Sequence, residues 1–155
     1  MNDVIARAFR SAEVHADLEP QGLLRGEGKR PDGATLIPWS HGKHAVWDFT
    51  CPDTLAPSHL AQTSLAAGSA AQSAEAGKRL KYAGLGTGYS FYPVAIETLG
   101  AWGRDAQQLV SELGGRQAAL TGDTRSLAFL RQRLGIAIQR GNAAAIRGTL
   151  PPSDV

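Results

Sequence analysis

Two short apolar runs joined by a polar turn constrain the fold of this chain more than any other feature. The runs are residues 34–37 and 44–51, and the turn between them, residues 38–42, contains Pro, Ser, His and Gly. Short runs of this kind, bounded by turn residues, are typical of β-strands, and a five-residue connection can join antiparallel strands. Pro52 has no N–H for further pairing. The sequence therefore predicts a β-hairpin.

Each side of this hairpin has one aspartate, Asp32 and Asp48. If opposed residue numbers add up to 80, Ala34 faces Val46, Ile37 faces Lys43 and the two aspartates face each other. The alternation of side chains in a strand then sends Trp47 and Phe49 to the opposite face, toward the core.

Opposed residues in an antiparallel pair have Cβ atoms about 5 Å apart, so the two carboxylates repel each other. At an effective dielectric constant near 20, the cost is about 3 kcal/mol. A shared proton, a neighbouring lysine or a divalent cation would compensate, and oxygen ligands favour Mg²⁺ or Mn²⁺ over zinc. The alternative is a pair of solvated acids on an edge hairpin.

Residues 58–82 are rich in Ala, Gln and Leu and predict one long helix. Small side chains recur on one face of it, which indicates close packing against a sheet; the stripe is Leu60, Ser64, Ala67, Ala71, Ala74 and Lys78. Glu75, Lys78 and Tyr82 share a helix face. A buried lysine needs a partner, which the two carboxylates would supply. Alternatively, Lys78 reaches solvent or pairs with Glu75 on the surface.

The rest of the chain predicts a helix at 4–16, a connector rich in Pro and Gly, a third strand at 91–99, and helices at 105–120 and 124–147. Pro93 places the third strand at a sheet edge or a bulge. We expect one α/β (α+β) domain over residues 1–155, with a small mixed sheet and a central hairpin flanked by helices, plus C-terminal helices.

Composition excludes several classes of protein. The chain is 43% hydrophobic and 19% charged, with a single cysteine, Cys51, so a disulfide within the chain and a Cys-rich zinc knuckle are excluded. We expect an intracellular protein that is neither secreted nor bound to a membrane. Residues 124–153 contain five arginines and no acid, a charge pattern that fits either a polyanion partner or a solvated helix face.

Pro31-Asp32, then Asp48, then Lys78 and Tyr82 as a KxxxY motif, together resemble the PD-(D/E)XK superfamily of restriction-endonuclease-like nucleases. The order is most similar to the C-terminal endonuclease domain of non-LTR retrotransposon reverse-transcriptase polyproteins. The resemblance implies a nuclease-like core at residues 17–103, followed by a helical basic tail at 104–155. It also implies that the chain is part of a larger polyprotein, nuclear if the element is eukaryotic.

The resemblance implies a magnesium-dependent DNA endonuclease. Asp32, Asp48 and the Phe49 carbonyl would hold Mg²⁺ or Mn²⁺, and Lys78, with Lys81 as its substitute and Tyr82 positioning it, would act on the scissile phosphate. The residues expected to bind DNA are Lys29, Arg30, Lys43, Arg133, Arg140 and Arg147; the last three recur every seven residues.

The chain departs from the superfamily pattern at Thr50, where the usual lysine is missing. Two alternatives to an active nuclease therefore stay open. One is a catalytically inactive nuclease fold that binds DNA or another protein. The other is a helical interaction protein whose motif is a coincidence. Glu19 is a further acid close to this region, for which a surface role is the simpler reading.

Overall fold

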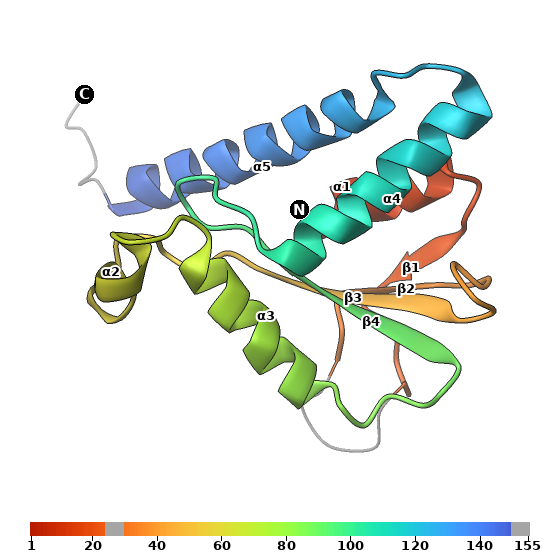
Figure 1. Ribbon diagram of the computed structural model, residues 1–155, viewed down its shortest axis with the longest axis horizontal. Helices are drawn as coiled ribbons and strands as arrows, with labels where there is room; N and C mark the ends of the chain where they lie inside the picture. The colour runs from red at the N-terminus through yellow and green to blue at the C-terminus, as the bar shows by residue number, and fades with distance from the viewer. Residues whose placement is uncertain (24–29, 150–155) are drawn as a thin grey trace.

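A computed structural model describes residues 1–23 and 30–149, and in these residues five helices surround a four-stranded mixed sheet (Figure 1). The helices are α1 (Asn2–Ser11), α2 (Pro57–Thr63), α3 (Ser69–Lys81), α4 (Arg104–Thr121) and α5 (Ser126–Thr149). The strands are β1 (Ala16–Leu18), β2 (Gly33–Thr35), β3 (His44–Thr50) and β4 (Tyr89–Ala95). The predicted mixed α/β architecture is confirmed at this level.

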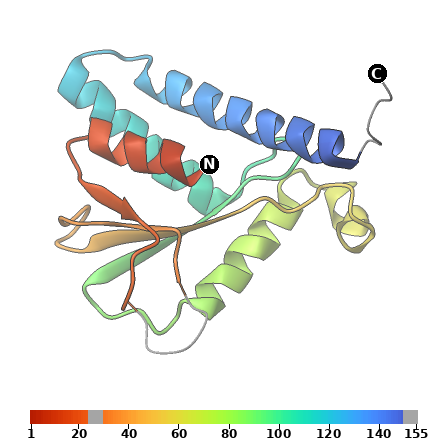
Figure 2. The same ribbon diagram turned by 180° about the vertical axis from the view of Figure 1, so that it is seen from behind.

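The strands lie in the order β1-β2-β3-β4, antiparallel except for the parallel pair β3 and β4. Ala34 pairs with Val46 and Gly33 with Trp47, which confirms the predicted hairpin register. Helices α1 and α4 cover one face of the sheet, with α5 packed outside α4, while α3 covers the other face (Figures 1 and 2). The sheet therefore separates α3 from α5.

The hydrophobic core lies between the sheet and helices α1, α4 and α5. Trp47 is fully buried there and stacks on Phe9 of α1, with ring centroids 5.2 Å apart. Half-buried Phe49 packs against the same core. Both side chains thus point where the alternation predicts, and Asp48 between them points to the α3 side. Helices α4 and α5 contribute Leu109 and Leu134 to this core.

The hairpin turn is shorter than predicted. His41 and Gly42 form its tip with φ values of 49° and 72°, and Ser40 bridges to Lys43. Two consecutive left-handed residues are the geometry of a tight two-residue hairpin. The expected pairing of Ile37 with Lys43 is wrong, because β2 ends at Thr35 and the next two residues, Leu36 and Ile37, are exposed.

The predicted helix 58–82 is divided into α2 and α3. Gly68 has a φ of 84°, which ends helical continuity, and the Glu97 carboxylate accepts the N–H groups of Ala70 at 3.0 Å and Ala71 at 3.2 Å, which caps the start of α3. The predicted stripe holds only beyond this break: Leu60, Ser64 and Ala67 are exposed, whereas Ala71, Ala74 and Lys78 are buried or half-buried.

Three smaller differences concern element ends. The first helix stops at Ser11, and residues 16–18 form β1, whose pairing with β2 depends on contacts distant in sequence. The third strand spans Tyr89–Ala95, two residues earlier than predicted at its start, and Pro93 lies on an edge strand as expected. Helix α5 continues through Gly135 and Gly141.

None of the helices in the described ranges is long and apolar enough to span a membrane.

Two adjacent glycines of α4 provide a matched test of its packing against α5. A Cβ on Gly114 would lie 2.7 Å from the Cα of Leu127, whereas a Cβ on exposed Gly115 would meet nothing within 4 Å. We expect Gly114→Ala to lower the free energy of unfolding by about 1 to 3 kcal/mol through overpacking. Gly115→Ala should raise it by up to about 1 kcal/mol through helix propensity. Urea denaturation of both variants measures the difference, and equal effects would contradict this packing.

Candidate active site

Three elements bring four of the predicted side chains together on the α3 side of the sheet. Asp32 comes directly before β2, Asp48 lies on β3, Lys78 lies in the last turns of α3, and Tyr82 follows that helix as its C-cap. Asp48 is at the centre of the group and is 4% exposed. Because α3 lies across the strands, residues about fifty positions apart in the sequence meet here.

Both oxygens of the Asp48 carboxylate contact α3 side chains. The Tyr82 hydroxyl lies 2.8 Å from Oδ1, and the Lys78 ammonium forms an ion pair with Oδ2. The Lys78 side chain is 26% exposed, so its charge remains partly solvated. Among the described residues, Oδ2 accepts no hydrogen bond of ordinary geometry, so the ammonium alone compensates this oxygen. A buried carboxylate with one oxygen held only by charge is well placed to exchange that partner.

Asp32 forms hydrogen bonds to the two residues of β3 that flank Asp48. Its backbone N–H donates to the Trp47 carbonyl at 3.0 Å, and its Oδ2 accepts the Phe49 N–H at 2.6 Å. The predicted proximity of the two acids is therefore present, although Asp32 lies outside the paired part of β2. The Asp32 carboxylate thus accepts the Phe49 N–H in place of a backbone carbonyl of a neighbouring strand.

Tyr82 links Asp48 to the chain that precedes β2. Its hydroxyl also lies 2.9 Å from the Arg30 carbonyl, and its ring packs against Phe91 in a tilted arrangement with centroids 4.7 Å apart. Burial raises the pKa of the phenol well above its usual value, and the hydrogen bond to Asp48 and the charges of both aspartates raise it further. Tyr82 is therefore a neutral hydrogen-bond donor at physiological pH.

A second buried carboxylate holds α3 in place. Glu75 accepts the N–H groups of Asp105 at 3.1 Å and Ala106 at 3.0 Å, at the start of α4. The Glu75 carboxylate can lie this close to the start of α4 because Gly103 has no side chain. A Cβ at Gly103 would lie 2.1 Å from the Glu75 carboxylate. Burial raises the pKa of Glu75 against the effect of these hydrogen bonds. Glu75 is thus engaged with α4, and the surface pair of Glu75 with Lys78 does not form.

The remaining residues predicted near the acids occupy different positions. The Lys81 ammonium lies 4.9 Å from the centre of the Tyr82 ring, in cation–π contact. The Arg30 guanidinium forms an ion pair with Glu19, whose backbone N–H donates to the Asp32 carbonyl at 2.8 Å. Lys29 lies outside the described residues.

The other predicted DNA contacts are distant from the acids. Lys43 follows the hairpin tip, five residues before Asp48 and therefore about 16 Å away along the strand. Arg133, Arg140 and Arg147 are exposed on α5, on the other side of the sheet (Figures 1 and 2). These arginines and the acids cannot contact the same phosphate.

The carboxylates suit a hard divalent cation. Within residues 1–23 and 30–149, no group of three His, Cys, Asp or Glu side chains is arranged to hold a metal. Magnesium nevertheless needs only one or two carboxylates, because water and substrate phosphate complete its coordination. Asp32 and Asp48, with the carbonyl of Phe49, the residue after Asp48, form a donor set of this kind. The poorly satisfied Oδ2 of Asp48 supports the fit.

Sequence reasoning missed the role of two carboxylates, Glu97 and Glu75, which cap α3 and α4. Glu97 lies within the predicted strand 91–99, where the alternation of side chains suggests no role for it. Its capping partners lie 26 and 27 residues earlier, so no local pattern identifies it. For Glu75, the Gly-Arg-Asp sequence at 103–105 marks a helix start that lacks a capping side chain of its own; this was the available signal.

Replacement of Tyr82 by Phe tests how Asp48 is held. Loss of the hydroxyl leaves Oδ1 of a buried carboxylate without its donor, so we expect a loss of about 1 to 3 kcal/mol in unfolding free energy. Tyr89→Phe is the control, since no described residue bonds to the Tyr89 hydroxyl, and should change stability little.

The pH dependence adds a second measurement. Because the phenol pKa of Tyr82 is raised in the folded state, the unfolded chain ionises first and stability falls as the pH rises above about 10. Urea denaturation at neutral pH and at pH values above about 10 should show a smaller loss of unfolding free energy for Tyr82→Phe than for the wild type. An identical fall in both proteins would contradict the burial of this phenol.

Comparison with known proteins does not extend this description. No protein-family model matches the sequence, and no curated protein matches it at a significant level. The function therefore has to be argued from the geometry of the site itself.

Proposed function

We propose that the chain is a magnesium-dependent DNA endonuclease with a restriction-endonuclease-like fold, derived from a retrotransposon polyprotein. The observation that carries this proposal is the buried Asp48, in contact with Lys78 and Tyr82 and adjacent to Asp32. The four residues come from the ordered motif that resembles the superfamily. Their convergence around one carboxylate supports a common role for them.

Each side chain has a distinct role in phosphodiester hydrolysis. Asp32 and Asp48, with the Phe49 carbonyl, would hold Mg²⁺, which lowers the pKa of a bound water and offsets charge on the phosphate. Lys78, whose side chain is partly exposed beside Asp48, would orient the attacking water and stabilise charge that develops on the phosphate oxygens. Tyr82 keeps Asp48 in position by donating a hydrogen bond to Oδ1.

Lys78 could take the role of the lysine that the superfamily pattern has where this chain has Thr50. Lys78 reaches Asp48 from α3, so an ammonium is present beside the acid without a lysine on β3. Lys81 is engaged with the Tyr82 ring and stands further from the carboxylate. Lys78 is therefore the stronger candidate for the catalytic lysine.

One observation favours a second function, a catalytically inactive DNA-binding module. The Lys78–Asp48 ion pair compensates the buried carboxylate without any metal, so the fold does not depend on a cation. Such a module would bind DNA equally well in the presence of a chelator. In the active enzyme, by contrast, Asp32 and Asp48 would hold a divalent cation, and nicking would depend on it.

Replacement of Asp48 by Asn distinguishes these functions. We expect the wild-type protein to nick supercoiled plasmid DNA with Mg²⁺ or Mn²⁺, and Asp48→Asn to lose this activity while it stays folded, because the amide cannot replace the carboxylate as a cation ligand. Gel analysis of the plasmid measures nicking. Mn²⁺ should also raise the melting temperature of the wild type and not that of Asp32→Ala. Undiminished nicking by Asp48→Asn would remove the assignment.

The two lysines of α3 offer a matched comparison. Lys78→Ala removes a group aimed at the reacting phosphate and should lower kcat about 100-fold or more. Lys81→Ala, one helical turn later, should change kcat only severalfold, because its ammonium contacts the Tyr82 ring and not Asp48. Single-turnover cleavage of a labelled duplex measures both rates. A larger loss with Lys81→Ala would transfer the catalytic role to that residue.

A further inference from the structure

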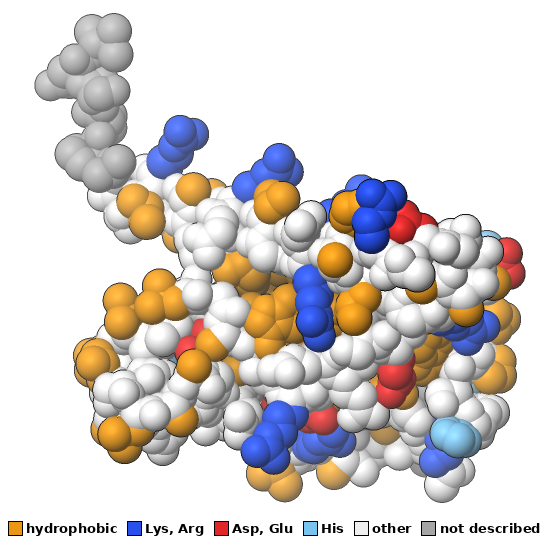
Figure 3. Space-filling view, turned by 45° about the horizontal axis from the view of Figure 1, so that its top comes forward, with side chains coloured by type: hydrophobic (Ala, Val, Ile, Leu, Met, Phe, Trp, Pro, Cys, Tyr) orange, Lys and Arg blue, Asp and Glu red, His pale blue; other side chains and the backbone are white. Residues whose placement is uncertain are grey.

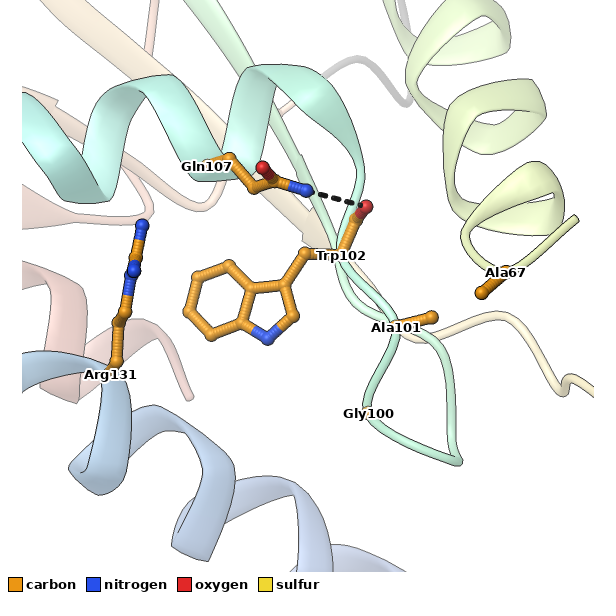
Figure 4. A pocket seen from close by; sticks show the side chains of 6 residues that line it. All are labelled: Ala67, Gly100, Ala101, Trp102, Gln107 and Arg131. Atoms are coloured by element: carbon orange, nitrogen blue, oxygen red, sulfur yellow. Dashed lines mark hydrogen bonds between the residues drawn. The ribbon is translucent and has the colours of Figure 1, made fainter.

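A pocket lies near the C-terminal end of β4, outside the candidate active site. It has a volume of about 430 Å³ and is lined by Ala67, Gly100, Ala101, Trp102, Gln107 and Arg131. Figure 4 shows the Trp102 ring in the pocket, with Gln107 above it on α4 and Arg131 beside it on α5, the Arg131 side chain directed toward α4. Figure 3 shows hydrophobic side chains in a hollow beneath α5 and basic side chains beside it.

The chemistry of the lining is that of an aromatic platform beside a cation. Trp102 is half-buried, whereas the other two tryptophans, Trp39 and Trp47, are 8% and 0% exposed. Its carbonyl accepts the Gln107 side-chain N–H at 3.3 Å, which ties the loop to α4. The walls at Ala67, Gly100 and Ala101 have almost no side chain, so a flat ring can approach the indole.

The charge of the pocket is positive. Arg131 is exposed and lies 3.5 Å from the Ser111 hydroxyl, and no acid lines the pocket. Asp105, an acid in the first turn of α4, is already paired with Arg79. The first N–H groups of α4 are occupied by Glu75, so an anion here would depend on Arg131.

We propose that this pocket binds a nucleotide of single-stranded DNA, with the unpaired base stacked on Trp102 and the phosphate paired with Arg131. Stacking of a base on an aromatic side chain next to a basic group is the common mode of single-strand binding. The choice of DNA as ligand rests on the proposed nuclease function, which this inference deepens.

The position of the pocket fits a strand that continues from the active site. Trp102 bridges to Ile96, three residues beyond Pro93, and Pro93 pairs with Asp48. The Ile96 bridge to Trp102 therefore lies about 10 Å beyond Pro93 when measured along the chain. Strand β4 is the edge of the sheet, so in the described part of the chain no further strand separates the two sites. A single strand leaving the cut position can reach Trp102 around this edge.

The test uses the intrinsic fluorescence of Trp102, the one tryptophan that is not buried. With chelator present to prevent cleavage, an oligo(dT) of about 8 nucleotides should quench the tryptophan emission in a saturable way. Trp102→Phe should lose the quenching signal. Measured by anisotropy of labelled oligo(dT), Trp102→Ala should weaken binding at least about fivefold, because it removes the stacking surface.

A second variant avoids any effect on the core, against which Trp102 also packs. Arg131→Gln changes an exposed side chain, and it should reduce the slope of log K against log salt by about 0.7, the contribution of one phosphate contact on a single strand. Arg7→Gln, which removes one exposed charge on α1, is the control and should leave the slope unchanged.

The outcomes separate this inference from the nuclease itself. Saturable quenching that persists in Asp48→Asn supports the pocket, and it would do so even if the wild type proved unable to nick DNA. Absence of quenching, or an unchanged salt slope in Arg131→Gln, would overturn the inference even if nicking were observed. Tighter quenching by a short acidic peptide than by oligo(dT) would also overturn it, since the pocket would then bind protein.

Discussion

The compensation of one buried charge determines how this molecule is arranged. Asp48 is almost fully buried, and a carboxylate in that position is stable only with partners that offset its loss of hydration. Those partners, Lys78 and Tyr82, lie at the C-terminal end of α3. The helix must therefore lie across β3 in one orientation, and the same contacts that stabilise Asp48 place an ammonium and a phenol beside Asp32. Stability and the proposed chemistry share one set of interactions.

Two further carboxylates fix the helix that supplies these partners. Glu97 accepts N–H groups at the start of α3, and Glu75 on α3 accepts N–H groups at the start of α4. Negative charge at a helix N-terminus is favourable, since it offsets the unpaired donors there. The segment that follows β4, helix α3 and helix α4 are thus connected in series by hydrogen bonds. The position of Lys78 is set by this framework at least as much as by its own ion pair.

The sheet separates two groups of basic residues in the part of the chain that the structure describes. On the α3 side, Lys78 contacts Asp48, Lys81 lies over the Tyr82 ring and Arg30 pairs with Glu19. On the other side, Arg133, Arg140 and Arg147 are exposed on α5. DNA bound at the acids would meet the first group, and the α5 arginines would contact a different segment of backbone. Trp102, which bridges to Ile96 just beyond β4, shares a pocket with Arg131 of α5.

The sequence by itself determined the local features: the strand at 44–50, the pairing of Ala34 with Val46, the core direction of Trp47, and the face shared by Lys78 and Tyr82. Alternation of side chains and helical periodicity depend only on neighbours in the chain, so they can be read without a structure. Tertiary structure alone decided the break at Gly68, the capping by Glu75 and Glu97, the formation of β1 and the placement of the α5 arginines on the far side of the sheet. Those features arise from contacts between residues far apart in the sequence, where burial and the need to satisfy backbone N–H groups prevail over local preference.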